Sequence, residues 1–223
     1  MNFFQKIKVL TKDPGGPRQP VYPRITLDEI PPASALLFYN GNKLTERAGR
    51  AIFKHPYWPP AFHAAIYVWN HLCLNVNKFK TLEDVTEGFN SNRRIDVVIY
   101  HELTDEQRKE ISREAALDAS PHKMGLVLPD YAVTDYLRFL FRKLPPSRKD
   151  FCSENVVELF GRAPAHGVRR VSEWYEAVKA SGGIRIAPGL PVDTTPWDIQ
   201  EGAETGFGGA ELRTLHLGPD YPF

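Results

Sequence analysis

Two short apolar stretches separated by three residues constrain the fold of this chain more than any other feature. They are Ala61–Val68 and Leu72–Val76, and the residues between them are Trp69–His71. Successive side chains of a β-strand point to opposite faces, so the length of the turn decides which residues share a face. A three-residue turn places Val68 opposite Leu72 and predicts a β-hairpin.

This turn length separates apolar from polar side chains. One face then carries Ala64, Ile66, Val68, Leu72, Leu74 and Val76, and the other carries His63, Ala65, Tyr67, Cys73 and Asn75. A two-residue turn would mix the two kinds and would place His63 and Asn75 on opposite faces. We therefore predict the first register, in which Asn75 is a diagonal cross-strand neighbour of His63, within reach of its ring.

A cysteine far downstream stands where a helix is predicted to begin. The prolines of Pro145–Lys149 stop the preceding helix, and the pattern after them predicts a helix from Cys152 to about Phe160. A thiol at a helix N-terminus lies at the positive end of the helix dipole, which lowers its pKa and favours the nucleophilic thiolate. A histidine that reaches this thiol completes the minimum set for nucleophilic catalysis. The candidate catalytic residues are Cys152, His63 and Asn75.

The order of five segments along the chain is also informative. They are Ala35–Gly41, His63–Val68, Asn75, Phe151–Val156 and Thr195–Ile199. Together they resemble the permuted papain-like cysteine hydrolases, the NlpC/P60-related group that includes the YiiX/YaeF-type enzymes and the lecithin retinol acyltransferase-like proteins. The resemblance covers residues 33 to 200. It implies an α+β fold of the circularly permuted papain-like type, with a small antiparallel sheet packed on helices and the histidine before the cysteine in the chain.

Two positions differ from the pattern of this family. Members often have Gly-Asp just before the first strand, where this chain has Ser34-Ala35. The third polar position is commonly His or Glu, where this chain has Asn75. The altered Ser34-Ala35 leaves open a second class of function, a catalytically silent binding or structural module that retains the fold.

The chemistry implied by the candidate residues is acyl transfer on an amide or ester. Cys152 attacks a carbonyl carbon, His63 takes the thiol proton and returns it to the leaving group, and Asn75 orients the imidazole. The backbone N–H of Cys152 is the predicted oxyanion donor, because first-turn N–H groups lack a partner within the helix. Tyr39 or Tyr131 could add a side-chain donor. Water as acceptor gives an amidase, peptidase or thioesterase, and a second substrate gives an acyltransferase. The resemblance allows peptide, cell-wall peptide and lipid acyl substrates.

The composition bounds the other classes of function. A chain of 223 residues with 42% hydrophobic residues can bury one core. Its net charge of +1 gives no electrostatic footprint for nucleic acid. No apolar run approaches the ~20 residues of a membrane span, and the charged N-terminus is not typical of a secretory signal. Two cysteines favour a reducing cytoplasm over a disulfide framework. No phosphate loop or dinucleotide fingerprint is found, so no cofactor is expected.

Two further side chains of the hairpin have other interpretations. Cys73 lies in mid-strand and is predicted to be buried and inert. A zinc site from His63, His71, Cys73 and Cys152 is disfavoured, because the chain has no Cys-x-x-Cys pair and the adopted register places His71 in the turn.

The sequence also predicts the domain organisation and the remaining strands and helices. Residues 1–32 are expected to form an N-terminal arm, 33–200 the catalytic domain and 201–223 a C-terminal extension that is extended or looped. Strands are predicted at 36–39 and 95–100, and helices at 44–53, 104–119, 131–143 and 169–180. A capping-box sequence, Thr104–Gln107, opens the second of these helices. The loop with Tyr57 and Trp58 is interpreted as covered, with a substrate wall beside His63 as the alternative.

Overall fold

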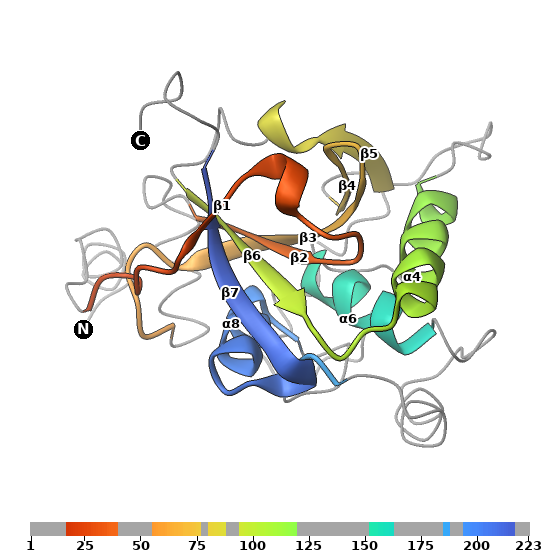
Figure 1. The fold of residues 1–223 in the computed structure, drawn as a ribbon. Helices are drawn as coiled ribbons and strands as arrows, with labels where there is room; N and C mark the ends of the chain where they lie inside the picture. Colours follow the sequence, from red (N-terminus) through yellow and green to blue (C-terminus); the bar gives the residue numbers. More distant parts are fainter. Residues whose placement is uncertain are drawn as a thin grey trace, which may run out of the picture.

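The computed structural model describes residues 17–39, 55–76, 80–87, 94–119, 152–162, 185–187 and 194–216. These residues form a mixed α+β structure around a seven-stranded sheet (Figure 1). The strands are β1 (Arg24–Ile25), β2 (Ala35–Tyr39), β3 (Ala61–Trp69), β4 (Leu72–Val76), β5 (Lys80–Asp84), β6 (Arg94–Tyr100) and β7 (Ala210–Leu215). The helices with described bounds are α4 (Asp105–Asp118), α6 (Cys152–Arg162) and α8 (Pro196–Glu204), with the 3-10 helices η1 (Leu27–Glu29) and η3 (Phe207–Gly209).

The strand order of the sheet places β3 in its interior. The order is β1-β7-β6-β2-β3-β4-β5, so β3 has β2 on one side and β4 on the other. β1 and β7 are parallel, and the other neighbouring pairs are antiparallel. The sheet is larger than the small antiparallel sheet that the resemblance implies, because segments near both ends of the chain contribute β1 and β7.

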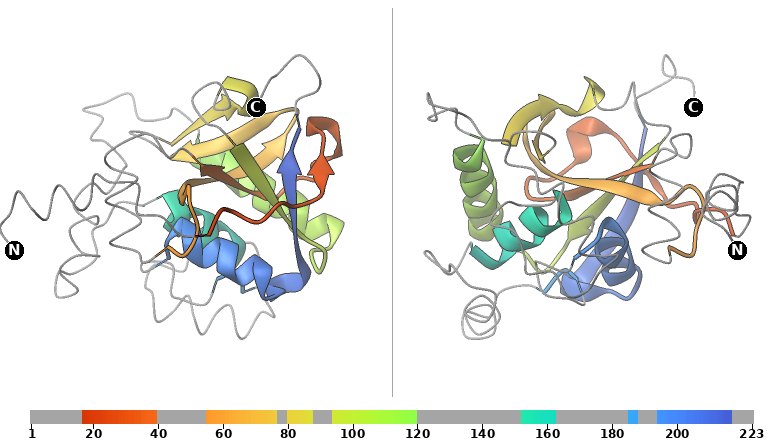
Figure 2. Two further views of the ribbon diagram at one scale, coloured as in Figure 1. Left: turned by 90° about the vertical axis from the view of Figure 1, so that its left-hand side faces the viewer. Right: turned by 180° about the vertical axis from the view of Figure 1, so that it is seen from behind.

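The two faces of the sheet are covered by different elements. Helices α4, α6 and α8 pack against β3 on one face, as the side view shows (Figure 2). On that face Ala64, Ile66 and Val68 of β3 belong to the core cluster that contains the buried side chains of the three helices. On the other face Ala65 and Tyr67 belong to a second cluster, formed with the chain around η1. The alternation along β3 is therefore confirmed.

The hairpin of β3 and β4 has the predicted register but a shorter turn. Tyr67 pairs with Cys73, as predicted, whereas Trp69 pairs with Leu72. The two residues between, Asn70–His71, have φ angles of 47° and 65°, the left-handed conformation of a two-residue hairpin turn. A bulge between Tyr67 and Trp69 absorbs the extra residue. The predicted turn length is wrong, and the bulge keeps the faces as predicted.

Several other elements lie where the sequence predicts them. Strands β2 and β6 cover the predicted ranges 36–39 and 95–100. Helix α4 begins at the predicted capping box, where the Thr104 hydroxyl accepts from the N–H of Gln107 at 3.2 Å. Helix α6 begins at Cys152. The helices predicted at 44–53, 131–143 and 169–180 lie outside the described residues. In the part of the chain that the structure describes, no helix is long and apolar enough to cross a membrane.

Both terminal segments contribute strands to the sheet. The expectation of an extended or looped tail is wrong for residues 201–204, which continue α8. Residues 210–215 are extended, and as β7 they pair with β6 and β1. The expected boundaries at 32 and 200 do not separate the strands, because β1 and β7 share one sheet with β2. The six residues of β7 do not alternate throughout between apolar and polar, and only Leu212 and Leu215 are buried. The preceding glycines, within 206–209, made this stretch look like a loop.

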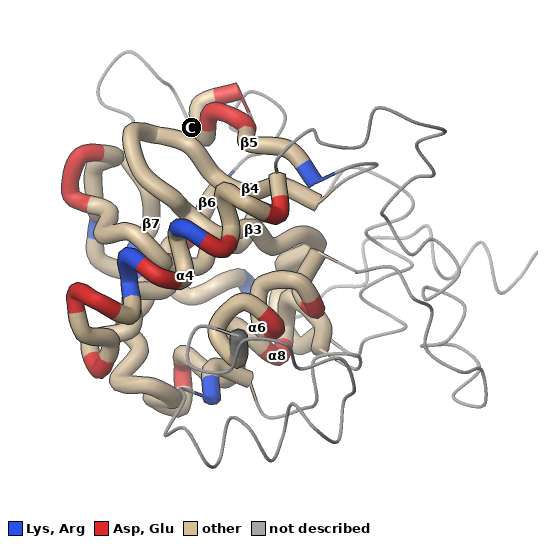
Figure 3. The backbone as a smooth tube through the Cα atoms, turned by 90° about the vertical axis from the view of Figure 1, so that its right-hand side faces the viewer, with Lys and Arg blue, Asp and Glu red and all other residues tan. Residues whose placement is uncertain are grey.

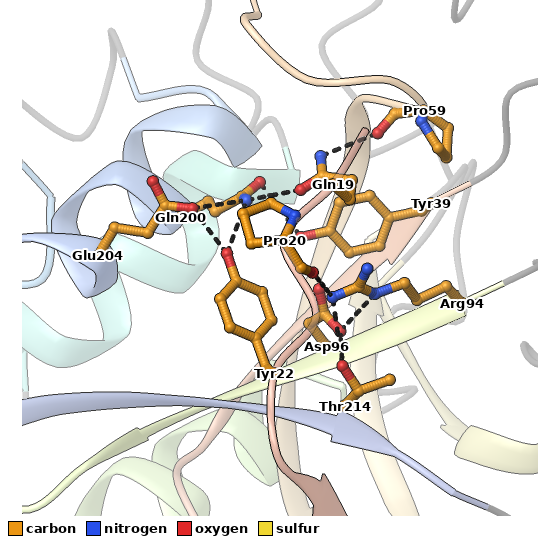
Figure 4. Close-up of polar contacts among 10 residues, drawn as sticks. All are labelled: Gln19, Pro20, Tyr22, Tyr39, Pro59, Arg94, Asp96, Gln200, Glu204 and Thr214. Atoms are coloured by element: carbon orange, nitrogen blue, oxygen red, sulfur yellow. Dashed lines mark hydrogen bonds and ion pairs between the residues drawn. The ribbon is translucent and has the colours of Figure 1, made fainter. Parts of the chain in front are cut away.

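An ion pair between the partly buried Arg94 and the fully buried Asp96 anchors the N-terminal segment to the sheet (Figure 4). Nε of Arg94 donates to Oδ1 of Asp96 at 2.7 Å, and the Thr214 hydroxyl donates to the same oxygen at 2.7 Å. Nη2 of Arg94 donates to the backbone carbonyl of Pro20 at 2.7 Å. Burial raises the pKa of Asp96, and the guanidinium acts in the opposite direction. The carboxylate therefore depends on these donors to offset the cost of its desolvation.

Gln200 of α8 is the centre of the second half of this network (Figure 4). Its Nε2 donates to Oε1 of Gln19 at 2.8 Å and to Oε1 of Glu204 at 3.0 Å, and its Oε1 accepts from the Tyr39 hydroxyl at 3.2 Å. Nε2 of Gln19 in turn donates to the carbonyl of Pro59 at 2.9 Å. Gln19 and Gln200 are both buried. The described part of the N-terminal arm is thus docked on the domain.

The docking predicts that Gln19→Ala lowers the free energy of unfolding by about 1–3 kcal/mol, because buried partners lose their hydrogen bonds. Val21→Ala is the matched control in the same segment. Val21 is 93% exposed, so its substitution should change stability by less than about 0.5 kcal/mol. Urea unfolding of the full chain measures both variants. Equal, small effects would show that the segment is not docked in solution.

Candidate active site

His63 and Asn75 meet on the face of the hairpin that the sequence predicts. Nε2 of His63 in β3 lies 2.5 Å from Oδ1 of Asn75 in β4. Both side chains are buried, at 9% and 8% exposure. Because a one-residue slip would send one of them to the other face, this contact confirms the predicted register.

The imidazole of His63 sits in a largely apolar environment. Its ring centre lies 5.5 Å from that of Phe38 and 6.3 Å from that of Phe62. Burial lowers the pKa of His63, while the hydrogen bond with Asn75 and the negative charge of Glu83 raise it by less. The imidazole is therefore neutral at neutral pH, and one of its nitrogens carries a lone pair that can take a proton.

Cys152 is the first residue of α6, and its side chain is fully buried. The sulfur accepts from the backbone N–H groups of Ala64 and Ser153, which lower the pKa of the thiol. Burial outweighs these donors and raises the pKa of Cys152 to about 11. The prediction of a thiolate at the helix start is therefore wrong for this arrangement, because the helix start lies out of water.

The hydrogen-bond pattern of β3 explains why the N–H of Ala64 is available to the sulfur. The N–H and C=O of Tyr67 both bond to Ala33–Ser34, on the side of β2. Consecutive residues of an antiparallel strand bond to opposite sides, so the N–H of Ala64 points toward β4. The described ladder of β3 with β4 begins at the pair Ile66 and Leu74 and continues toward the turn. The sulfur of Cys152 thus takes the place of a ladder partner.

The thiol lies beside the strand that carries the imidazole, but the two groups are not joined. The sulfur bonds to the residue directly after His63, and among the described residues no hydrogen bond links it to the ring. The structure brings His63 and Asn75 together on the face of β3 opposite to the one that α6 packs against, and Cys152, at the start of α6, contacts the backbone of β3 at Ala64. The Ser153 hydroxyl donates to the carbonyl of Thr194 at 2.6 Å, which ties the start of α6 to the start of α8.

Glu83 of β5 extends this polar chain and was not predicted. Nδ2 of Asn75 donates to Oε2 of Glu83 at 2.5 Å, and the Thr81 hydroxyl donates to Oε1 at 2.7 Å. The stretch Lys80–Asp84 is short and polar, so it lacks the pattern of a buried strand. The available signal is the spacing of Thr81 and Glu83, which lie opposite Asn75 and Cys73 on one face.

The remaining polar candidates have other surroundings. Cys73 is free and buried, and burial raises its pKa to about 12, as expected for an inert thiol. Nε2 of His71 lies 3.0 Å from Oδ1 of Asp28, in the turn. Within the described ranges, no group of three or more His, Cys, Asp and Glu side chains is arranged to hold a metal ion.

The aromatic candidates are used in packing. The hydroxyl of Tyr39 donates to α8, so its proton is not directed at Cys152. Tyr131 lies outside the described residues. Trp58 is buried, and the Tyr57 ring lies 5.7 Å from that of Trp197 in the first turn of α8. These contacts favour the covered loop over the substrate wall.

Comparisons of the chain with models of protein families, with curated proteins and with solved structures found no match. The relationship to permuted papain-like hydrolases therefore stays a resemblance of motifs and of their order.

The buried thiol predicts a pH dependence of alkylation. Labelling of Cys152 by iodoacetamide should be slow at neutral pH and accelerate about tenfold per pH unit toward its pKa of about 11, because the thiolate reacts. Mass spectrometry of digests follows each cysteine, and Cys73→Ser is the matched control. A rate already maximal at neutral pH would mean that the helix start outweighs burial.

The contact between Asn75 and Glu83 predicts that Asn75→Asp lowers the free energy of unfolding in a pH-dependent way. In Asn75→Asp two carboxylates would face each other, which raises the pKa of one above its unfolded value. The loss of unfolding free energy, about 1–3 kcal/mol, should be full above that pKa and shrink as the pH falls through it. Urea unfolding at neutral and acidic pH measures it. Asn75→Ala adds no charge, and a loss with the same pH dependence in both variants would contradict this account.

Proposed function

We propose that this protein is a cysteine-dependent hydrolase that acts on an amide or ester by nucleophilic acyl transfer. Cys152 is the nucleophile, His63 the general base and acid, and Asn75 the residue that orients the imidazole. The observation that carries the proposal is the 2.5 Å contact between Nε2 of His63 and Oδ1 of Asn75. It holds a neutral imidazole by Nε2 and leaves Nδ1 outside this contact, and Cys-His-Asn catalysis needs the second ring nitrogen as the base for the thiol.

We propose the permuted papain-like arrangement for the fold. Three features support it: the histidine strand β3 precedes the cysteine helix α6 in the chain, α6 packs against β3, and the third polar residue lies on the neighbouring strand β4. Both cysteines are free, as a nucleophilic role for Cys152 requires.

The raised pKa of Cys152 decides how the nucleophile is generated. The thiol is protonated before the reaction and therefore needs a base. In the proposed reaction the Cys152 side chain gives up its hydrogen bond with the N–H of Ala64 and rotates toward Nδ1 of His63. His63 takes the proton while the sulfur adds to the carbonyl carbon of the substrate. The N–H groups of Cys152 and Ser153 in the first helical turn are the donors for the oxyanion.

The second half of the reaction restores the thiol. The carbon–nitrogen or carbon–oxygen bond of the substrate breaks, and the imidazolium of His63 gives its proton to the leaving group. Water then adds to the acyl–sulfur bond with His63 as base, the acid is released, and Cys152 regains its proton. An amine or alcohol in place of water makes the same site an acyltransferase. The substrate is a peptide-like or lipid-like acyl compound.

The second candidate is a binding or structural module that retains the fold without catalysis. The observation that favours it is the resting state of Cys152, which is fully buried and has a pKa of about 11. A module of this kind needs a thiol only as a small apolar side chain.

Acylation by an activated ester, p-nitrophenyl acetate, separates the two candidates. Intact-mass analysis after acid quenching should find one acetyl group, localised to Cys152 by digestion, in the natural protein and in Cys73→Ser. Cys152→Ala should lack this adduct. His63→Ala should acquire it at least about a hundredfold more slowly, because the general base is lost. Acylation of Cys152 at the same rate in His63→Ala, or acylation of lysines alone, would refute the hydrolase.

A further inference from the structure

The carboxylate of Glu83 lies on the same face of the sheet as Asn75 and accepts a hydrogen bond from it. This contact fixes the direction of the next hydrogen bond, between Asn75 and the imidazole of His63. We propose that Glu83 is a positioning residue that sets the tautomer of His63, so that Nε2 carries the hydrogen and Nδ1 the lone pair. Its catalytic meaning rests on the proposed function. Its effect on the tautomer does not.

The pairing of β4 with β5 brings the residues of this chain together. Asn75 pairs with Thr81 and Cys73 pairs with Glu83, so the four side chains share one face of the sheet. Glu83 reaches diagonally to Asn75, whose Nδ2 donates to Oε2 at 2.5 Å. The Thr81 hydroxyl donates to Oε1 at 2.7 Å. Both oxygens of Glu83 are thus engaged, and one holds the Asn75 amide.

The chemistry of the groups leaves one arrangement of hydrogens. An ionised carboxylate only accepts, so the NH2 end of the Asn75 amide faces Glu83. The amide oxygen of Asn75 then faces Nε2 of His63, as the 2.5 Å contact has it. An amide oxygen only accepts, so Nε2 is the nitrogen that carries hydrogen. Nδ1 is left as the basic nitrogen.

Without the carboxylate, Asn75 has no reason to keep this orientation. The two ends of an amide have nearly the same shape, and which end faces a neighbour is decided by hydrogen bonding. A reversed amide would donate Nδ2 to Nε2 of His63 and would place the hydrogen on Nδ1. An imidazole in that tautomer cannot take the thiol proton at Nδ1.

No other charged side chain of these strands could replace Glu83 in this role. β3 and β4 contain no Lys, Arg, Asp or Glu, and their trace is uncharged throughout (Figure 3). The other charged residues of β5 face other partners. Lys80 donates to Asp118 of α4 at 3.3 Å, and Oδ1 of Asp84 accepts from Thr86 at 2.6 Å.

The tautomer can be measured without any substrate. Long-range proton–nitrogen NMR spectra of the ¹⁵N-labelled full chain, at neutral pH, show which ring nitrogen of His63 carries hydrogen. The natural protein should show the Nε2–H form. Glu83→Gln, which keeps the size but offers both a donor and an acceptor, should show a mixture with the Nδ1–H form. Glu211→Gln, on β7 and paired with the exposed His101, is the matched control and should leave His63 unchanged.

A folded Glu83→Gln variant with His63 entirely in the Nε2–H form would overturn the proposal. Glu83→Asp keeps a carboxylate and should keep more of the Nε2–H form than Glu83→Gln, so it supplies a second comparison if Glu83→Gln does not fold. Acetylation of Cys152 should slow roughly ten- to a hundredfold in Glu83→Gln, by analogy with the loss of a partner that orients a metal-ligating histidine. An unchanged acetylation rate despite an altered tautomer would also refute a positioning role. If the natural protein is never acetylated at Cys152, the hydrolase fails, and the NMR result still decides the tautomer.

Discussion

The alternation of side chains along β3 is the constraint on which the core and the site both depend. Ala64, Ile66 and Val68 join the core formed with the helices, while His63 and Tyr67 are directed to the opposite face. A slip by one residue would turn the imidazole toward the helices and would turn the apolar set toward the polar contacts of the other face. The stability of the core therefore holds the histidine in place. The bulge beside the turn shows how strongly this register is determined, since the turn changes length while the faces do not.

The sequence predicts elements with a complete pattern and misses those whose partners lie far away in the chain. β2, β6 and α4 are buried strands or a capped amphipathic helix, and each can be recognised within its own window. β1, β5 and β7 are short or polar, and they become strands because a neighbour already offers an open edge. The docking of the N-terminal segment depends likewise on Arg94 and Gln200, which lie 74 and 181 residues away from their partners in that segment. No local pattern contains such contacts.

The same distinction applies to the candidate site. The contact of His63 with Asn75 could be predicted, because it follows from one hairpin and its period of two. The pKa of Cys152 could not, because the helix start acts within one turn while burial depends on everything packed around it. The local donors do act on the sulfur in the expected direction, and the loss of water outweighs them. A cysteine at a helix start thus predicts a reactive thiolate only where the helix start is also open to solvent.

The polar chain from Glu83 to His63 keeps a charge near the imidazole without placing it in direct contact. A carboxylate hydrogen-bonded directly to His63 would favour the protonated ring and raise its pKa strongly. The amide of Asn75 is neutral, so Glu83 acts through it on orientation and only weakly on the pKa, which burial keeps low. A low pKa keeps the imidazole unprotonated at neutral pH. The pKa of Cys152, about 11, keeps its thiol protonated. The thiol can then give its proton to the unprotonated imidazole. Asparagine at the third position is therefore consistent with a site that makes its nucleophile during the reaction.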